Sequence, residues 1–487
     1  MTRRLGRALS LAALALLSAC GGKKVQAPDD GGPVTQRASG SKERESVAVT
    51  IYNDNFGLVR EERTVALGKG RVELAYEDVS ANIEPETVHI KSLSDADELS
   101  VLEQNYRYDL LSPDTLLKKY VGKKLKVARY NEKLGTDEIK QAELLAIEGG
   151  PVLKIDGEIV VGFPGRFLFP EVPENLLPKP TLVWLLASGL EKQKLEVTYL
   201  TRNLSWKADY VLVLSPDDKQ GDLAGWVTLE NNTGTSYEHA QLKLVAGDVQ
   251  RVAPPPPPQA PMPESVAMDM AAPTRPQFER ESLFEYHLYS LQRPTDLLDK
   301  ERKQVRLLEA AGITLKKKLI LRGFDWYFRQ QTGELPPKQK LGVFVEISNS
   351  EKNQLGIPLP KGVLRVYKAD KSGSRQFVGE DGIDHTPRDE DFEVKLGDAF
   401  DVLADRRQMT WKTLGSCGSE STWEIKVKNH KDTAERVELW EPASGEWDIV
   451  QSSHKARREN ASTFVFEVDV PARGETKVTY TVRVRWC

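Results

Sequence analysis

The sequence predicts an all-β protein made of several antiparallel β domains. Short runs in which apolar and polar residues alternate recur along most of the chain, and this is the pattern of half-buried strands. Gly, Asn, Asp and Pro separate these runs, as in the turns between strands. The length of 487 residues exceeds what one hydrophobic core organises, so we expect several domains.

The N-terminus resembles a bacterial lipoprotein signal peptide. Three arginines within the first seven residues precede an apolar segment at 8–17, which is too short to span a bilayer. The sequence LSACG at 17–21 then resembles a lipobox, in which the cysteine is diacylated and becomes the first mature residue. We therefore predict a signal peptide over 1–19 and a lipid on Cys20. The alternative is an ordinary cleavable signal in which the cysteine is accidental.

The predicted anchor implies a location and a set of partners. Residues 20–45 are rich in Gly, Pro, Asp, Ser and Lys, so we expect a disordered tether there. By resemblance to enterobacterial sorting, Gly21 favours the periplasmic face of the outer membrane. The net charge is only −4, which predicts no nucleic-acid partner. The expected partners are the membrane, through the anchor, and an envelope protein or polysaccharide.

Two small β domains are predicted after the tether. Residues 46–110 read as antiparallel strands joined by tight turns. Residues 111–170 are expected to form a small SH3-like β-barrel. There, Ser112 followed by Pro and Asp starts a short helix, and Asp156-Gly157 joins two of five short strands as a hairpin turn.

The remaining chain reads as β-sandwiches. Residues 171–410 are predicted as a β-sandwich region and residues 411–487 as a C-terminal immunoglobulin-like domain. A proline-rich loop at 253–277 interrupts the first region, either as a surface insertion or as a docking site for a partner that reads such peptides. A weak repeat supports the sandwiches, because an alternating strand ends in Asn before a polar turn three times. These asparagines are Asn231, Asn349 and Asn429.

Several segments together resemble bacterial proteins that carry domain of unknown function 4139. These segments are residues 49–60, 204–210, 244–248, 359–367 and 377–381. The resemblance covers nearly all of the mature chain and is strongest from about Thr198 onward. It implies a β-rich envelope or secreted protein, and it implies no catalytic residues.

Cys417 and Cys487 are the thiols that remain after the predicted lipid anchor. An oxidising envelope permits a disulfide between them. Strand alternation places Cys487 on the wet face of the last strand, within reach of the loop that holds Cys417. Two thiols fix a count but no distance, so the bonded and the free state both stay open.

Two groups of residues are candidates for a site. Asp381, Asp384, Asp389 and Asp391, in the acidic loop 380–391, offer oxygen ligands that suit Ca²⁺, and His385 can form an acid–base pair with Asp381. A solvated loop is the competing interpretation.

Trp440 and Trp447 flank a turn and, if both are exposed, form a platform for sugar rings or a protein. Packing in the core is the competing interpretation. The chain lacks HExxH, paired CxxC, P-loop and GxSxG motifs. We therefore expect no cofactor and a non-catalytic binding or scaffolding role. The alternatives are a metal-assisted hydrolase that uses loop 380–391 and a carbohydrate-binding module.

Overall fold

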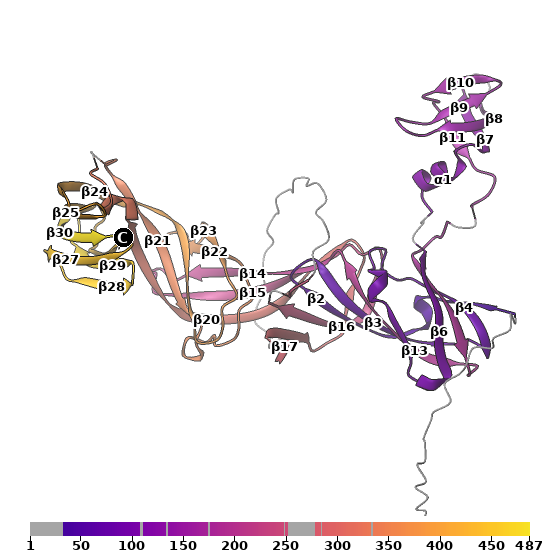
Figure 1. Cartoon of the computed structure of the whole chain (residues 1–487), viewed down its shortest axis with the longest axis horizontal. Coiled ribbons are helices and arrows are strands. Elements are labelled where there is room, and N and C mark those ends of the chain that lie inside the picture. The colour runs from indigo at the N-terminus through magenta and orange to yellow at the C-terminus, as the bar shows by residue number, and fades with distance from the viewer. Residues whose placement is uncertain are drawn as a thin grey trace, which may run out of the picture. The chain divides into compact units, whose positions relative to one another are not determined.

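The structure, a computed structural model, consists of β-strands and one α-helix among the residues that it describes (Figure 1). These residues are 33–107, 111–132, 135–173, 176–247, 249–251, 278–283, 285–332 and 335–487. The predicted all-β class is therefore confirmed. The chain divides into two compact units. Unit 1 is Met1–Ala48, Leu58–Arg202 and Thr233–Tyr237, and unit 2 is Val49–Gly57, Asn203–Asn232 and Glu238–Cys487.

A four-stranded sheet lies at the centre of unit 1. In sheet order its strands are β1 (Thr35–Ser39), β4 (Gly70–Glu77), β12 (Thr181–Ser188) and β6 (Leu99–Arg107). β1 runs parallel to β4, while β12 is antiparallel to both of its neighbours and is buried along nearly its whole length. The tether predicted for 20–45 is wrong from β1 onward. This polar segment is ordered by backbone pairing with β4, which composition does not reveal.

Other short elements complete unit 1. They are η1 (Ser41–Glu43), β2 (Arg44–Tyr52), β3 (Phe56–Val65), η2 (Pro85–Thr87), β5 (His89–Ser92), η3 (Ala96–Glu98) and β13 (Gln193–Arg202). β13 is antiparallel to β5, with Leu195 opposite Ser92. β2 and β3 contribute residues to both units. Along β2 and β3 buried residues alternate with more exposed ones, as the sequence pattern predicted.

The predicted small barrel is an open sheet packed against a helix. Its elements are α1 (Pro113–Tyr120), β7 (Lys124–Asn131), β8 (Thr136–Ala146), β9 (Val152–Ile155), β10 (Glu158–Val161) and β11 (Arg166–Leu168). The sheet order is β10-β9-β8-β7-β11, so β10 and β11 are opposite edges and the barrel does not close. The helix start is as predicted, since Ser112 Oγ accepts a hydrogen bond from Thr115 N.

The first part of unit 2 is built on long antiparallel strands. Its main sheet has the order β23 (Arg375–Ile383), β22 (Gly362–Ala369), β14 (Leu204–Leu214), β15 (Gln220–Asn231) and β20 (Glu301–Arg322). β14 is parallel to β22, and the other pairs are antiparallel. A separate sheet holds β16 (Tyr237–Ala246), β17 (Phe278–Leu283) and β18 (Tyr286–Leu291), in which β18 is antiparallel to both β16 and β17, and β19 (Thr295–Leu297) pairs with β16.

The last part of unit 2 is a β-sandwich-like module, which we call the C-terminal module. One layer has the order β21 (Gln339–Ser348), β24 (Asp391–Thr413), β25 (Gly418–Asn429), β30 (Glu475–Arg485) and β27 (Glu446–Ser452). The other layer contains the end of β20 with β26 (Glu435–Pro442), β29 (Thr463–Val470) and β28 (Ala456–Asn460). Its core holds Trp423, Phe464 and Tyr480. The remaining short helices are η4 (Asp325–Phe328) and η5 (Glu351–Asn353).

The predicted domain boundary at residue 411 is wrong. β24 runs without a break through that position, and its second half pairs with β25. The core of the C-terminal module includes Leu319 from β20 and Val402 from β24. Each of these two long strands therefore pairs with different strands along its length. The alternation of apolar and polar residues does not show where such a strand changes partners.

The predicted asparagine repeat corresponds to a repeated structure. Asn231, Asn349 and Asn429 are all buried at strand ends, and each side-chain Nδ2 donates to a backbone carbonyl of the turn that leads into the neighbouring strand. The acceptors are Leu297, Pro387 and Pro471, at 2.9, 2.7 and 3.1 Å respectively. We call each such contact an asparagine latch.

The three latches also share their turn geometry. Each turn contains a residue with positive φ just before the incoming strand. These residues are Lys300, Asp389 and Arg473, with φ of 59°, 63° and 49°. In two of the three turns this residue's N–H donates to the latch asparagine's own carbonyl, at 2.7 Å for Lys300 and 2.8 Å for Asp389. The repeat is therefore a structural device that closes antiparallel strand pairs.

Candidate functional site

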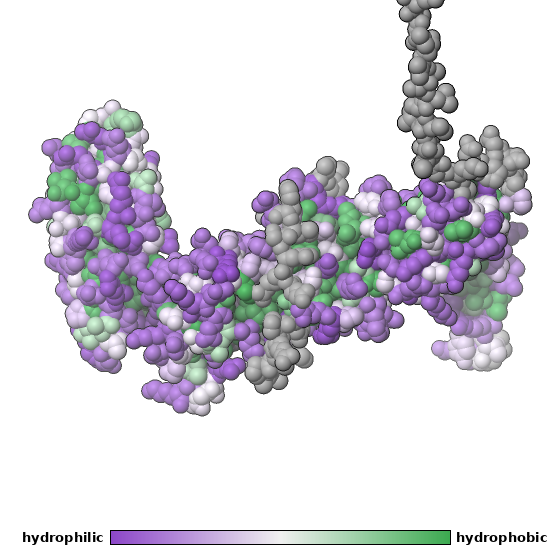
Figure 2. Space-filling view, turned by 90° about the horizontal axis from the view of Figure 1, so that it is seen from below, coloured by the Kyte–Doolittle hydropathy of each residue, from purple (hydrophilic) through white to green (hydrophobic). Residues whose placement is uncertain are grey.

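Two exposed aromatic side chains stand at the end of β20 in the C-terminal module. Phe324 is 56% exposed and Trp326 is 43% exposed. Their ring centroids are 6.4 Å apart and their planes differ by 22°. On the face shown in Figure 2, hydrophobic residues reach the surface among hydrophilic ones. We call the pair Phe324 and Trp326 the aromatic ledge.

The next two residues of η4 fix the ledge to the core. Tyr327 and Phe328 are buried. The Tyr327 ring meets the Phe324 ring at 5.5 Å and 90° and the Trp326 ring at 4.5 Å and 70°, so it supports both from below. The Phe328 ring packs edge-on against Trp423 at 5.9 Å. The exposed rings therefore rest on an aromatic cluster that is continuous with the core.

A buried ion pair lies beneath Tyr327. The side chains of Arg406 and Glu441 are both fully buried, and their Nη1 and Oε2 atoms are 2.5 Å apart. The Arg406 guanidinium is 5.0 Å from the centroid of the Tyr327 ring, a cation–π distance. Burial is the largest single effect and lowers the pKa of Arg406, but the charge and hydrogen bond of Glu441, together with Tyr480 and Tyr327, outweigh it, so the net pKa of Arg406 is raised. Burial, and then the Glu441 charge, raise the pKa of Tyr480 well above its ordinary value.

Gly323 allows the chain to pass close over this ion pair. A Cβ atom at Gly323 would lie 2.6 Å from Glu441 Oε2 and 3.0 Å from Arg406 Nη1. Gly323 N donates to the carbonyl of Trp440 at 2.7 Å, which holds the backbone in that position. No larger residue fits there without moving the charged groups.

Polar contacts hold the rest of the ledge segment. Asp325 Oδ1 accepts from Ser444 N at 2.5 Å, and Asp325 Oδ2 pairs with Arg329 Nε at 2.7 Å. The Ser419 hydroxyl donates to the Phe328 carbonyl at 2.5 Å. Gln408, on β24, donates to the carbonyl of Tyr327 at 3.5 Å. The segment is therefore attached to several strands of the C-terminal module.

More than half of the chain, at its C-terminal end, matches a known protein family. The family described as "Domain of unknown function (DUF4139)" matches residues 195–487, which hold the three asparagine latches and the aromatic ledge. The chain belongs to this family. No curated protein matches it.

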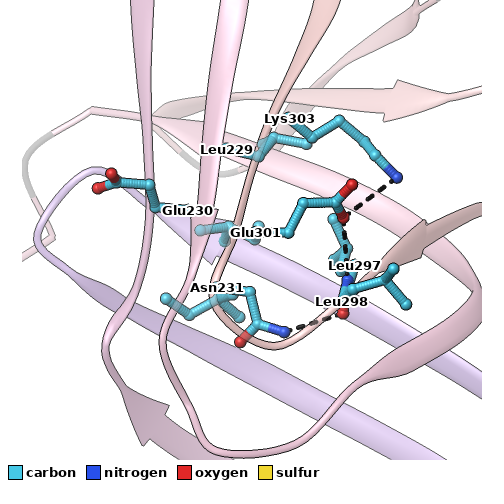
Figure 3. Close-up of a pocket in the computed structure, with 9 residues that line it drawn as sticks. Leu229, Glu230, Asn231, Leu297, Leu298, Glu301 and Lys303 are labelled. Atoms are coloured by element: carbon cyan, nitrogen blue, oxygen red, sulfur yellow. Dashed lines mark hydrogen bonds and ion pairs between the residues drawn. The ribbon is translucent and has the colours of Figure 1, made fainter. Parts of the chain in front are cut away.

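A surface crevice of this DUF4139 chain lies at the first asparagine latch (Figure 3). Its lining is Ile51, Leu204, Leu229, Glu230, Asn231, Leu297, Leu298, Glu301 and Lys303. Its volume of about 190 Å³ includes open solvent. Glu301 accepts from Leu298 N at 3.1 Å and lies 3.5 Å from Lys303 Nζ, while Asn231 donates to Leu297. The polar groups of the rim are thus engaged within the protein, and the crevice is a shallow depression.

The structure does not assemble the four predicted aspartates into a metal cluster. Asp381 lies in β23 and accepts from Lys395 N at 2.7 Å and from its neighbour Gly382 N at 2.9 Å. Asp384 and Asp389 follow in the turn, and Asp391 begins β24. Over the described part of the chain, no group of three or more His, Cys, Asp or Glu side chains is placed to hold a metal ion.

His385 occupies a structural position in the same loop. Its Nδ1 accepts a hydrogen bond from Lys361 N at 3.2 Å, which ties the loop to the start of β22. Glu380 lies in β23, and its carboxylate forms an ion pair with Arg365 of β22 at 3.0 Å. The acidic loop is thus joined to its neighbouring strand at both positions.

Of the two interpretations of Trp440 and Trp447, the structure favours packing over an exposed platform. Trp447 is only 8% exposed, belongs to the core, and donates through Nε1 to the carbonyl of Ala461 at 2.8 Å. Trp440 is half-buried and donates to Glu438 at 2.9 Å. β27 turns Trp447 inward, so the two rings share no open face. The sequence analysis did not predict Phe324 and Trp326 as site residues. The one sequence pattern that points to them is the presence of four aromatic residues within Phe324–Phe328.

The cysteines and the ends of the chain complete the predicted sites. Cys417 and Cys487 form a disulfide with Cα atoms 5.8 Å apart, and Trp486 N donates to the Cys417 carbonyl at 3.0 Å. The predicted signal peptide, the lipidation site Cys20 and the proline-rich loop 253–277 lie outside the described residues. None of the helices in the described residues is both long enough and apolar enough to cross a membrane.

Proposed function

We propose that this DUF4139 protein is a lipid-anchored envelope protein with a non-catalytic binding role, and that the aromatic ledge is its binding surface. The observation that carries the proposal is the exposure of Phe324 and Trp326 on a fixed base. Large apolar rings usually lie in the core, so two neighbouring exposed rings indicate a surface kept open for a ligand.

The rigidity of the ledge suits binding. Tyr327 holds both rings by edge contacts, and Gly323 and Asp325 fix the backbone on either side of Phe324. A ligand that meets rings already in place loses little binding free energy to ordering side chains. Aromatic residues of this kind supply most of the affinity at many binding surfaces.

The acidic loop favours a structural role over hydrolysis. The Asp381 carboxylate caps two backbone N–H groups, and Glu380 is paired with Arg365. A general base needs a carboxylate free to receive a proton from substrate or water. The engaged carboxylates therefore favour binding over the metal-assisted hydrolase.

The proposed location in the cell envelope rests on the lipobox-like sequence around Cys20. We expect the wild-type chain to incorporate labelled palmitate in bacterial cells and to fractionate with the outer membrane. The Cys20→Ser variant should lose the label and leave that fraction. Palmitate incorporation that persists in Cys20→Ser would overturn the anchor.

Capture from envelope extracts tests the binding surface. Wild-type protein should retain a specific envelope component that the Phe324→Ala/Trp326→Ala double variant does not. Phe400 is the matched control, because it is 85% exposed on β24 outside the ledge. Equal retention by wild type and the double variant, with loss in Phe400→Ala, would place binding elsewhere.

A further inference from the structure

We propose that the aromatic ledge binds the sugar rings of an uncharged polysaccharide. This inference rests on the proposed binding function and names its ligand class. The apolar C–H face of a sugar ring packs on an aromatic face, whose negative quadrupole attracts the slightly positive hydrogens. Phe324 and Trp326 offer two such rings as a partly exposed stacked pair whose planes differ by 22°.

The size of the ledge favours a sugar over a protein partner. An aromatic side chain covers about 150–250 Å², so the exposed fractions of Phe324 and Trp326 amount to roughly 200 Å² in all. A stable protein–protein interface covers about 800 Å² on each partner. The residues that flank the ledge in sequence include the exposed, hydrophilic Arg322 and Gln330. The apolar area thus matches a few sugar rings and is too small for a stable protein interface.

The charges around the ledge favour an uncharged ligand. Asp325 is paired with Arg329 at 2.7 Å, and Arg322 is 3.8 Å from Glu393. Among the described residues near the ledge, Arg322 and Arg329 are therefore each paired with a carboxylate, which leaves neither as an unpaired charge for a charged ligand.

The polar neighbours of the ledge suit sugar hydroxyls. Gln330 and Gln331, which follow Arg329 after the end of η4, are both exposed. An amide side chain offers two donors and one acceptor oxygen, which matches hydroxyl groups that both donate and accept. Exposed apolar rings and exposed amides in one short segment supply the two contacts that a sugar uses, stacking on its ring face and hydrogen bonds at its hydroxyls.

The test is calorimetric titration of the full-length lipoprotein in detergent with chitohexaose and with cellohexaose, beside a pull-down on insoluble chitin. We expect binding of at least one of these three probes. Trp326→Ala and Phe324→Ala should each weaken it by about tenfold, because ring stacking is lost. Trp326→Phe should recover most of the affinity, and Phe400→Ala should leave it unchanged.

Three results would overturn the inference. The first is no binding of any of the three sugar probes. The second is sugar binding that survives in the Phe324→Ala/Trp326→Ala double variant. The third is strong quenching of Trp326 fluorescence by brominated phospholipid in vesicles that carry the lipoprotein, since this would place the ledge in the membrane. If the sugars fail while ledge-dependent capture of an envelope protein persists, the ligand class is wrong and the binding function stands. If both fail, the proposed function fails with it.

Discussion

The guanidinium of Arg406 and the carboxylate of Glu441 meet at 2.5 Å with both side chains fully buried, directly beneath the ring that supports the ledge. Removing two charges from water is expensive, and a well-packed apolar pair often replaces such an ion pair without loss of stability. The ion pair is therefore better explained by the position it imposes on Tyr327 than by any net gain in stability.

This view predicts different effects for single and double substitutions of the pair. Arg406→Met leaves Glu441 charged and unpaired, so the free energy of unfolding should fall by about 3–5 kcal/mol. Arg406→Met/Glu441→Leu should regain most of that loss, because no charge stays buried alone. Urea unfolding followed by circular dichroism measures both. A double variant as unstable as the single one would show that the pair itself stabilises the fold.

Gly323 should not tolerate a side chain. Because a Cβ would lie 2.6 Å from Glu441 Oε2, Gly323→Ala should lower the free energy of unfolding by about 1–3 kcal/mol through overpacking. Gly382→Ala is the matched control, since open space surrounds its Cβ position. Thermal unfolding compares the two variants, and equal melting temperatures would refute the close approach at Gly323.

Each asparagine latch should stabilise the fold measurably, because its side chain is buried and hydrogen-bonded. Asn231→Ala leaves the Leu297 carbonyl without its side-chain donor, which should cost about 1–3 kcal/mol. The adjacent Asn232 is exposed, so Asn232→Ala should change stability by only about 0.5 kcal/mol. Chemical denaturation of the pair of variants decides between a structural latch and a surface turn.

Unit 1 should lose stability at high pH through Tyr237. Burial raises the pKa of Tyr237 to about 12, above its ordinary value of 10.0. Its contribution is therefore complete below pH 10 and is lost as the pH rises toward 12, by about 1.4 kcal/mol per pH unit. Tyr237→Phe should flatten this part of the stability curve, whereas Tyr130→Phe, at a side chain 62% exposed, should not. Identical pH slopes for wild type and Tyr237→Phe would contradict the assignment.

The sequence revealed the elements whose signals are local. Strand alternation, the helix start at Ser112 and the three strand-ending asparagines depend on neighbouring residues, and each has its counterpart in the structure. The family assignment also followed from the sequence, since four of the five segments that carry the resemblance lie within the matched residues 195–487. The resemblance was predicted to cover nearly all of the mature chain, whereas the match begins at residue 195 and leaves out the segment at 49–60.

Features that depend on distant residues were not visible in the sequence. β1 is ordered by pairing with β4, and β24 passes from one partner to the next, so neither the tether nor the boundary at 411 was predicted correctly. The aromatic ledge was missed for the same reason. Only the contacts of Tyr327 and Phe328 with the core decide that Phe324 and Trp326 face outward.

Photocrosslinking in living cells tests the central claim most directly. p-Benzoylphenylalanine placed at Phe324 of the full-length protein should give one recurrent adduct with an envelope component, read by mass spectrometry after denaturing purification. The same probe at Phe400, which is also exposed, should not give that adduct. A common adduct at both positions, or none at Phe324, would contradict a binding function of the aromatic ledge.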